Sequence, residues 1–383
     1  MSRAPLAAIT GVATGFIQGA GGLEPLDMVA QVSAAAARDA GVSLREVDGL
    51  FAGLQTEFLS TLAIAEYLGI RPSFSDNNRV GGSSFLAQVQ QAALALEAGL
   101  CNVALVCYAS NQRSALGRLQ TSVAGSWSAT EAPFGPRFPV SSYALAAARH
   151  MHEYGTTRED LAAVAVSARQ WAQRNPEAFA RDPIAVEDVM NAPMVSSPLG
   201  RLDCCLVTDG AAALVMVRPD RAKASPKPPV YLLGAAAEHW HKQISAMPDL
   251  CTTAASVSGP RAYQQAGLEP RDIDVVQIYD AFTINTIVLL EDLGFCPKGE
   301  GGRFVADGHI APGGSLPVNT NGGGLSFAHP GMYGLFTLVE GTRQLRGEAG
   351  DRQVSGAATC LCQGSGGAFS SMVTAILGSG NAL

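Results

Sequence analysis

The stretch Gly322-Gly-Gly-Leu-Ser-Phe327 decides the fold, because its arrangement repeats an earlier one in the chain. It precedes a helical pattern that ends at Gly347, just as Gly81-Gly-Ser-Ser-Phe85 precedes one that ends at Gly99. In each half a strand-like run follows that helix after a short turn. Two similar halves of this kind predict an internal duplication. Gly-rich turns before helices are common, so an accidental likeness remains the alternative.

Short apolar runs alternate with helical patterns, which is typical of an α/β fold. The runs Val47–Phe51 and Val103–Cys107 predict buried strands, and helical spacing between them predicts a helix that ends at Gly99. Residues 109–197 are rich in Ser, Gly and Pro and predict a loop domain inserted in the first half. The Pro-rich segment 225–229 predicts a linker, so the predicted domains are 1–224, which carries the insertion, and 225–383.

Composition narrows the class of protein. With 47% hydrophobic and 15% charged residues, the 383-residue chain can bury a core in each of two domains. A net charge of −7 without any basic run argues against a nucleic-acid partner. Eight Cys residues without a CxxC pair do not suggest a disulfide framework. Since no signal peptide or membrane span is apparent, we expect a reduced, soluble, cytoplasmic protein.

Two clusters in the second half carry groups suited to acid–base chemistry. An apolar run from Val275 ends in Tyr279 and Asp280, and catalytic groups often lie at such strand ends. For Asp280 alone we favour a helix-capping role. His329 precedes a proline that biases it away from helical geometry. A His held on a Gly-rich turn before a helix is well placed to act as acid, base or hydrogen-bond donor.

A third cluster, Cys360-Leu-Cys362-Gln-Gly-Ser-Gly-Gly367, is a strand that runs into glycines. Its Cys-x-Cys pair has no partner ligands at suitable spacing, so no metal site is predicted. Gly-rich backbone beside a Cys is better suited to directing N–H groups at a developing oxyanion.

Together these blocks resemble the thiolase superfamily. His329-Pro-Gly after Gly-Gly-Leu-Ser resembles the family's "GHP" block, and Cys362-Gln-Gly-Ser-Gly-Gly resembles its C-terminal Cys-x-Gly-Gly block. Tyr279-Asp-Ala-Phe takes the place of its Asn-Glu-Ala-Phe or His-Asp-Cys-Phe block, and Leu202-Asp-Cys-Cys-Leu-Val-Thr-Asp-Gly resembles the sterol-carrier branch. The matches run in the family's order. The resemblance implies a thiolase fold: five αβαβα layers, two duplicated halves and an inserted loop domain.

The chain departs from the family at the nucleophile. Thiolases carry a Cys at the start of a buried helix, where the helix dipole favours the thiolate. Here the corresponding segment is Asn78-Arg-Val-Gly-Gly-Ser-Ser-Phe85, which places Gly82 at that position, with Gly81 or Ser83 as neighbouring alternatives. Gly cannot form an acyl-enzyme, and Ser83 would need a strong base. We expect Gly82 and Ser83 to lie in the substrate and oxyanion region.

The resemblance also assigns roles to other residues. It matches His329 to the family's His, Cys362 to its acid/base Cys and Gly364 to its oxyanion-hole glycine. Tyr279 stands in place of the Asn or His that normally helps the other oxyanion hole.

Retro-aldol cleavage of a β-hydroxyacyl-CoA needs a base, an acid and oxyanion donors but no nucleophile. The chain is similar to the thiolase-like steroid side-chain aldolases, through its Val80-Gly-Gly-Ser-Ser-Phe and His329-Pro-Gly-Met blocks. That similarity implies a bulky, steroid-like CoA thioester with a tertiary hydroxyl, a homodimer core and a small zinc-ribbon/OB-fold partner. It implies coenzyme A as part of the substrate and no permanently bound cofactor.

Our hypothesis assigns hydroxyl deprotonation to Tyr279 or Tyr333, with the other orienting the substrate. His329 binds or polarises the thioester oxygen, and Cys362 protonates the enolate. Since the unperturbed pKa of Tyr is about 10, a positive or hydrogen-bonding neighbour is expected to lower it.

Three alternatives remain: a degradative thiolase with an unusual nucleophile (Ser83, Cys101 or Cys107), a condensing enzyme working in the synthetic direction, and a non-catalytic scaffold that binds acyl-CoA or lipid. Two histidine pairs, His150/His152 and His239/His241, are interpreted as surface residues.

Overall fold

The computed structural model describes residues 4–55, 57–115 and 130–383. Its centre is a nine-stranded sheet, whose strands run in the spatial order β3 (Phe74–Asp76), β2 (Gly49–Ala52), β4 (Val103–Ser110), β7 (Gly210–Val217), β1 (Ala7–Gly15), β8 (Val230–His239), β11 (Ser371–Gly378), β10 (Thr359–Gly366) and β9 (Val275–Ile278). The predicted strands at 47–51 and 103–107 correspond to β2 and β4.

The two halves of this sheet have the same topology. From β1 through β7 and β4 to β2, the pairings are antiparallel, antiparallel and parallel. From β8 through β11 and β10 to β9, the pairings follow the same sequence. Even β3 has a remnant counterpart, because Val318 forms a single parallel bridge with Val276. The duplication predicted from the two Gly-rich turns is therefore confirmed.

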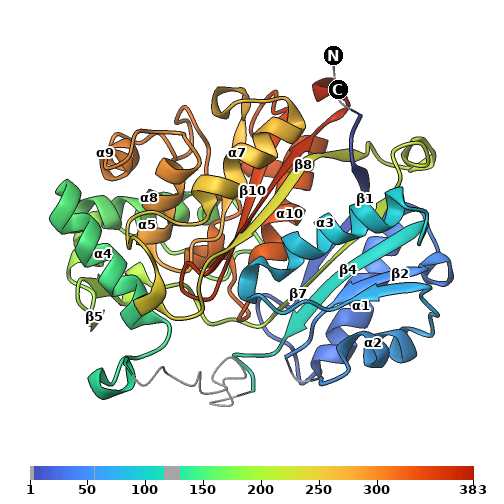
Figure 1. Ribbon diagram of the computed structural model, residues 1–383, viewed down its shortest axis with the longest axis horizontal. Coiled ribbons are helices and arrows are strands. Elements are labelled where there is room, and N and C mark those ends of the chain that lie inside the picture. The colour runs from blue at the N-terminus through green and yellow to red at the C-terminus, as the bar shows by residue number, and fades with distance from the viewer. Residues whose placement is uncertain (1–3, 56, 116–129) are drawn as a thin grey trace.

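Helices form the remaining layers (Figure 1). The outer face of the first half carries α1 (Pro25–Ala40) and α2 (Ser60–Leu68), and the outer face of the second carries α7 (Ala255–Ala266). Between the halves lie α3 (Ser84–Glu97) and α10 (Gly334–Arg346), which contact each other and strands of both halves. Within the described residues, the halves join edge to edge only where Ala7–Ile9 pair with Val230–Leu232. This arrangement gives the five αβαβα layers that were predicted.

The central helices approach each other closely at their N-termini. A Cβ atom on Gly334, the first residue of α10, would overlap the carbonyl oxygen of Gly82 and lie 3.0 Å from Cδ1 of Leu86. Glycine is therefore required at 334 for the two helix starts to meet. Residues Gly81–Ser83 form a tight turn that leads into α3, and Gly323–Phe327 form a π turn upstream of α10.

The region between β4 and β7 contains α4 (Val140–Tyr154), α5 (Arg158–Gln173), α6 (Val186–Met190) and the short strands β5 (Met194–Ser196) and β6 (Leu199–Gly200). In Figure 1 α4 and α5 lie on the left of the molecule, beside α8 (Thr283–Asp292) and α9 (Gly301–Ala306). Part of the predicted insertion, 116–129, lies outside the described residues. The division into domains at residue 224 remains a prediction.

Of the His150/His152 pair, which was interpreted as surface residues, His152 is exposed as predicted, but the interpretation of His150 is wrong. His150 is fully buried, with Nδ1 2.8 Å from Oγ1 of Thr156 and Nε2 3.0 Å from Oε2 of Glu291. It joins the insertion helix α4 to α8, which a helical pattern alone does not reveal.

All eight Cys residues are free thiols. In the part of the chain that is described, no helix is both long and apolar enough to span a membrane.

Candidate active site

The candidate site forms where three segments far apart in the sequence meet. These are the turn at 81–83 before α3, the residues that follow β9, and the turn that carries His329. Tyr279 follows β9, and its backbone N–H donates to the carbonyl of Gln363 in β10, 3.1 Å away. The backbone N–H of His329 donates to Oγ1 of Thr208 at 3.0 Å. Backbone hydrogen bonds to Gln363 and Thr208 therefore fix the positions of Tyr279 and His329.

Tyr279 and His329 form the central pair. The hydroxyl of Tyr279 lies 2.9 Å from Nε2 of His329, and the two rings are nearly perpendicular, with centroids 5.5 Å apart. Both residues were predicted from the sequence, and the structure brings them into direct contact. A hydroxyl and an imidazole in this geometry can pass a proton between them.

Burial keeps both groups of this pair uncharged at neutral pH. Desolvation lowers the pKa of His329 to about 4, so its imidazole is unprotonated. Desolvation, followed by the electrostatic effects of Cys205 and Tyr143, raises the pKa of Tyr279 well above 10. The expectation that a neighbour lowers the pKa of this Tyr is wrong, because burial outweighs the hydrogen bond from the Tyr333 backbone, which alone of the named causes lowers it. For Tyr279 to accept a proton, its own proton would have to pass to another group, and Nε2 of His329 lies within hydrogen-bond distance.

The ring of Tyr279 also occupies the space beside Gly82. A Cβ atom on Gly82 would overlap Cε2 of Tyr279, and would lie 2.5 Å from its Cζ and 2.6 Å from the carbonyl oxygen of Ser365. Any side chain at position 82, including the Cys of a thiolase, would collide with this ring.

Ser83 faces away from the central pair. Its hydroxyl is buried 2.7 Å from Oγ of Ser371 and donates to the carbonyl of Val80 at 3.0 Å. Ser371 in turn lies 2.8 Å from Nδ1 of His239. The side chain of Ser83 is thus engaged with strand β11, whereas its backbone closes the turn that leads into α3.

None of the cysteines whose pKa is shifted is an activated thiolate. Burial raises the pKa of Cys101 to about 11 and of Cys107 to about 12, and it raises the pKa of five others: Cys204, Cys205, Cys251, Cys296 and Cys360. A nucleophilic Cys needs a depressed pKa. Cys101 and Cys107, the first-half candidates, are buried in the core.

Tyr333 lies beside the central pair but makes a different contact. Its hydroxyl donates to Oδ1 of Asn321 at 2.8 Å, and its ring meets that of Tyr279 edge to face at 5.8 Å. Oδ1 of Asn321 also accepts the backbone N–H of Gly323 at 2.8 Å. Because burial raises the pKa of Tyr333 well above 10, its hydroxyl remains protonated.

Cys362 and Gly364 lie on β10. The thiol of Cys362 donates to the carbonyl of Thr337 in α10 at 3.4 Å and lies 3.9 Å from the Cys360 sulfur. Among the described residues, no hydrogen bond joins Cys362 to Tyr279, His329 or Tyr333. Gly364 faces the start of α3, where a Cβ atom would lie 3.0 Å from Cα of Ser83. The predicted acid and oxyanion roles of these two residues remain predictions.

Asp280 contributes to the site in a way that was not predicted from the sequence. It does not cap α8, whose N-cap residue is Phe282 and which has no side-chain cap. Instead its carboxyl group is fully buried and accepts the backbone N–H of Gly324 at 2.6 Å and of Leu325 at 3.3 Å. Burial raises the pKa of Asp280 to about 7. Asp280 thus fixes the turn that carries His329.

A second residue missed from the sequence, Tyr143, comes from the insertion helix α4. Its ring stacks on Phe282 at 4.5 Å and meets Phe369 edge-on at 4.8 Å. Its hydroxyl donates to the carbonyl of Gly367 at 2.8 Å. No local motif marks Tyr143, so only the packing of the insertion against Phe282 and the turn after β10 reveals that it lies near Tyr279.

Comparisons with known proteins agree with this fold. Residues 236–379 match the family described as "Thiolase C-terminal domain-like". The chain is 36% identical, over 89% of its length and 92% of the relative's, to a 17-hydroxy-3-oxo-4-pregnene-20-carboxyl-CoA lyase of Mycobacterium tuberculosis. It is also 36% identical, over 89% of its length and 91% of the relative's, to an acetyl-CoA acetyltransferase of Methanothermobacter thermautotrophicus.

A solved structure described as "Ltp2-ChsH2(DUF35) aldolase" superposes with a TM-score of 0.90 at 35% identity, covering 98% of this chain and 99% of that one. The relatives therefore include proteins named for both cleavage and acyl transfer, and the geometry of the site must decide between these reactions.

Proposed function

This chain belongs to the thiolase superfamily, in the branch that includes steroid side-chain-cleaving aldolases, and from that premise we propose that it is a retro-aldolase. It cleaves a β-hydroxyacyl-CoA with a tertiary hydroxyl into a ketone and a shorter acyl-CoA, without a covalent acyl-enzyme. The observation that carries this proposal is the contact between Tyr279 and Gly82, which leaves no room for a nucleophile at that position.

The reaction begins at the hydroxyl group. Tyr279 accepts the substrate's hydroxyl proton while it passes its own proton to Nε2 of His329, 2.9 Å away. The electron pair of the O–H bond forms the ketone, the Cα–Cβ bond breaks, and its electrons form the thioester enolate. A proton delivered to Cα completes the acyl-CoA. His329 then releases the proton it accepted to solvent, and the group that protonated Cα regains one from solvent, so no other reactant is consumed.

The enolate oxygen needs hydrogen-bond donors. The turn at Gly82 and Ser83 supplies backbone N–H groups at the positive end of the 14-residue helix α3 that follows it. Gly364 faces the same segment and is proposed as a further donor. Tyr333, held by Asn321, orients the substrate, and Cys362 is proposed to return the proton to Cα.

The substrate class is proposed from the comparisons. The Mycobacterium tuberculosis relative is named for a CoA thioester on a steroid skeleton with a 17-hydroxyl group. We propose a bulky fused-ring acyl-CoA for this chain as well, with coenzyme A present only as part of the substrate and no permanently bound cofactor.

We propose a homodimer core with a small zinc-ribbon/OB-fold partner, in the cytoplasm. Two features of the first half support the dimer. Strand β3 is at the edge of the sheet, where a second copy could pair with it. Large apolar side chains are also exposed on the helices of this half: Leu62 (62% exposed) and Tyr67 (51%) on α2, and Leu94 (53%) on α3. The similar aldolase structure is named for two proteins, Ltp2 and ChsH2, which supports the small partner.

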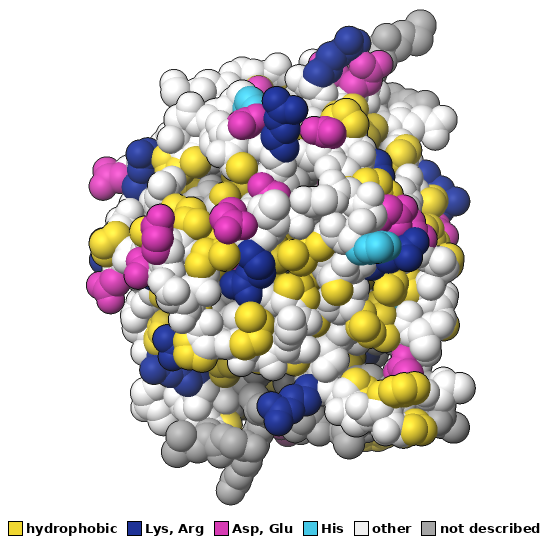
Figure 2. Space-filling model, turned by 90° about the vertical axis from the view of Figure 1, so that its left-hand side faces the viewer, with side chains coloured by type: hydrophobic (Ala, Val, Ile, Leu, Met, Phe, Trp, Pro, Cys, Tyr) yellow, Lys and Arg dark blue, Asp and Glu magenta, His cyan; other side chains and the backbone are white. Residues whose placement is uncertain are grey.

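The insertion offers a second exposed apolar area, with Phe134 (85%) before α4 and Leu145 (53%) on it. Figure 2 shows the face on the insertion side of the molecule, where acidic and basic side chains are interspersed with apolar ones and no single charge dominates. Such a mixed surface suits a protein partner better than a polyanion.

Turnover in D2O tests this proposal. Retro-aldol cleavage delivers one solvent-exchangeable proton to Cα, so the released acyl-CoA must gain one deuterium. The intact mass of the protein must stay unchanged when the reaction is quenched during steady-state turnover. An acylated protein would instead establish covalent catalysis and contradict the proposal.

A further inference from the structure

A cavity of about 230 Å³ lies beside the candidate active site. Gly81 and Met332 line it, and they are the sequence neighbours of Gly82 and Tyr333. Gly53 and Gln55 follow the carboxyl end of β2, and Asn78 follows that of β3. Since β2, β3 and β4 are parallel, the cavity occupies the crevice at the carboxyl ends of strands where α/β sheets bind ligands.

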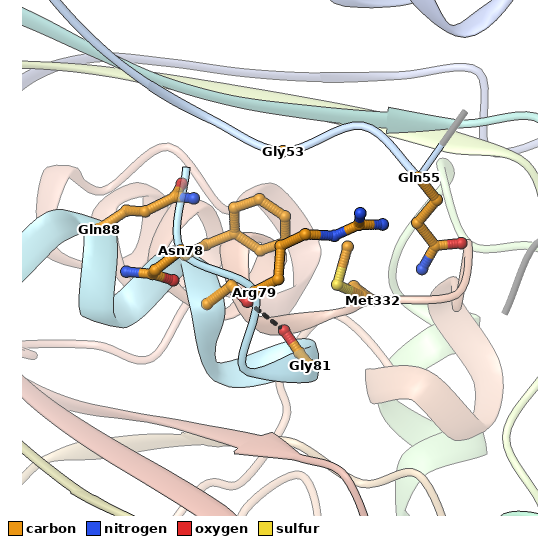
Figure 3. A pocket seen from close by; sticks show the side chains of 9 residues that line it. Gly53, Gln55, Asn78, Arg79, Gly81, Gln88 and Met332 are labelled. Carbon is orange, nitrogen blue, oxygen red and sulfur yellow. Dashed lines mark hydrogen bonds between the residues drawn. The ribbon is translucent and has the colours of Figure 1, made fainter. Parts of the chain in front are cut away.

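Gln88 is the most informative residue of this cavity. It lies on α3, is fully buried, and neither its Nε2 nor its Oε1 atom has a hydrogen-bond partner among the described residues. Figure 3 shows its amide directed into the cavity beside Asn78. A buried amide with two unused hydrogen-bonding atoms is destabilising unless something else occupies its donors and acceptors.

Two further lining residues share this property. Oε1 of Gln55 and Oδ1 of Asn78 are buried without a partner in the described part of the chain. Phe85 and Met332 add apolar surface between these amides. Arg79, the one charged residue among the described lining residues, is exposed. The interior is therefore lined by neutral donors and acceptors, which suit an uncharged polar group better than an anion.

We propose that this cavity is a substrate subsite in which the Gln88 amide binds an uncharged oxygen-bearing group of the acyl-CoA. This proposal rests on the proposed function. Two parts of such a substrate carry this chemistry: a ketone or hydroxyl on the ring skeleton, and an amide of the pantetheine arm. A cavity of about 230 Å³ is smaller than the roughly 300–1,000 Å³ of pockets that enclose whole drug-sized ligands, so it holds only part of the substrate.

The test compares two matched variants of one helix. Gln88→Met removes both amide atoms at similar volume. The control is Gln90→Met, whose parent side chain faces elsewhere and donates to the carbonyl of Ala235 at 3.1 Å. The probe is 3-oxo-4-pregnene-20-carboxyl-CoA, which lacks the 17-hydroxyl of the relative's substrate and therefore cannot undergo retro-aldol cleavage. Binding is measured by calorimetry with the full chain.

We expect Gln88→Met to raise the Kd about tenfold, the equivalent of one lost hydrogen bond, and Gln90→Met to change it less than twofold. Two further probes distinguish the sources. Loss of the effect with the probe lacking its 3-oxo group identifies the ring oxygen. Loss of the effect with the S-ethyl thioester, which has no pantetheine amides, identifies the arm. The subsite proposal would be overturned if Gln88→Met and wild type bound the probe with equal Kd values. It would also be overturned if both variants lost the same affinity, or if the wild type did not bind the probe.

Thermal unfolding separates binding from a structural role. Because Met replaces unpartnered polar atoms, the Tm of Gln88→Met is expected to equal or exceed that of the wild type. A lower Tm together with weaker binding would show that Gln88 serves the fold and overturn the proposal. Because the probe cannot react, its binding is measured independently of catalysis. If the Kd depended on Gln88 but the chain cleaved no hydroxyacyl-CoA, the retro-aldolase proposal would be refuted and the subsite would stand.

Discussion

The ring of Tyr279 fills the space that a side chain at Gly82 would require. Position 82 cannot gain a Cβ atom without overlapping Cε2 of Tyr279, and the hydroxyl of the same ring contacts Nε2 of His329. The Gly at the thiolase nucleophile position and the Tyr after β9 are thus sterically linked. The space that a Cys would occupy is taken by the group proposed to move the substrate's proton.

A double-mutant cycle tests this steric relationship. Gly82→Ala is expected to destabilise the protein by about 1–3 kcal/mol through overpacking. Combining it with Tyr279→Leu should cost less than the sum of the single changes by about 1 kcal/mol or more, measured by chemical unfolding. Relief is partial, because the carbonyl oxygen of Ser365 also lies 2.6 Å from the added Cβ atom. Gly53→Ala, where a Cβ atom meets nothing within 4 Å, is the control. Strict additivity would refute the contact.

Removing only the hydroxyl of Tyr279 tests its chemical role. Tyr279→Phe keeps the ring beside Gly82 but breaks the path to His329, so kcat for a tertiary β-hydroxyacyl-CoA is expected to fall by about 10²–10⁴-fold. Tyr263→Phe is the matched control, since the Tyr263 hydroxyl donates to the carbonyl of Leu293 at 3.2 Å, outside the site. Near-normal turnover in Tyr279→Phe would remove this residue from the mechanism.

The sequence left open which of two tyrosines takes the proton, and Tyr333→Phe decides it. Because the Tyr333 hydroxyl bonds Asn321 rather than His329, its loss should reduce kcat only about tenfold, consistent with one orienting hydrogen bond. The comparison of kcat between the two Phe variants is the measurement. A larger loss from Tyr333→Phe than from Tyr279→Phe would reverse the assignment of roles.

Asp280 is expected to make stability depend on pH. Its folded pKa of about 7 lies above the ordinary value of 3.8, so between these values the folded state retains a proton that the unfolded state loses. The free energy of unfolding should therefore fall as pH rises from about 4 to about 7, by up to about 4 kcal/mol from this group. The lowered pKa of His329 acts in the opposite direction below pH 6.5, so wild type must be compared with Asp280→Asn.

The difference between the two unfolding curves isolates the carboxyl group. Relative to Asp280→Asn, wild type should lose stability steadily across this pH range in urea titrations. Parallel pH profiles would mean that the Asp280 carboxylate is stabilised by the N–H groups of Gly324 and Leu325 and is ionised throughout.

How far the sequence could predict this site depends on what each residue contacts. Tyr279 and His329 are predictable as site residues because local sequence indicates their positions. Tyr279 ends an apolar strand pattern, and His329 lies between a Gly-rich turn and a proline. The choice among 81, 82 and 83 required coordinates, since consecutive residues at a helix start point in different directions: position 82 points at Tyr279, whereas Ser83 bonds Ser371.

Other residues carried no local signal at all. Tyr143 reaches the site only through packing of the insertion, and Asp280 bonds a turn 44 residues away in sequence rather than the adjacent helix. His150 resembled a surface residue because its partner Glu291 belongs to another helix. The roles of these residues depend on contacts with residues distant in the sequence, and such contacts cannot be predicted from hydrophobic periodicity.

The most direct test of the central claim is a mass-spectrometric assay of two substrates. One is a β-hydroxyacyl-CoA with a tertiary hydroxyl, given without free CoA, and the other is a 3-ketoacyl-CoA given with CoA. The chain is assayed with and without the proposed small partner. We predict that the hydroxy substrate alone is cleaved, to a ketone and a shorter acyl-CoA. CoA-dependent cleavage of the keto substrate, with the hydroxy substrate untouched, would show a thiolase with a displaced nucleophile and contradict the account.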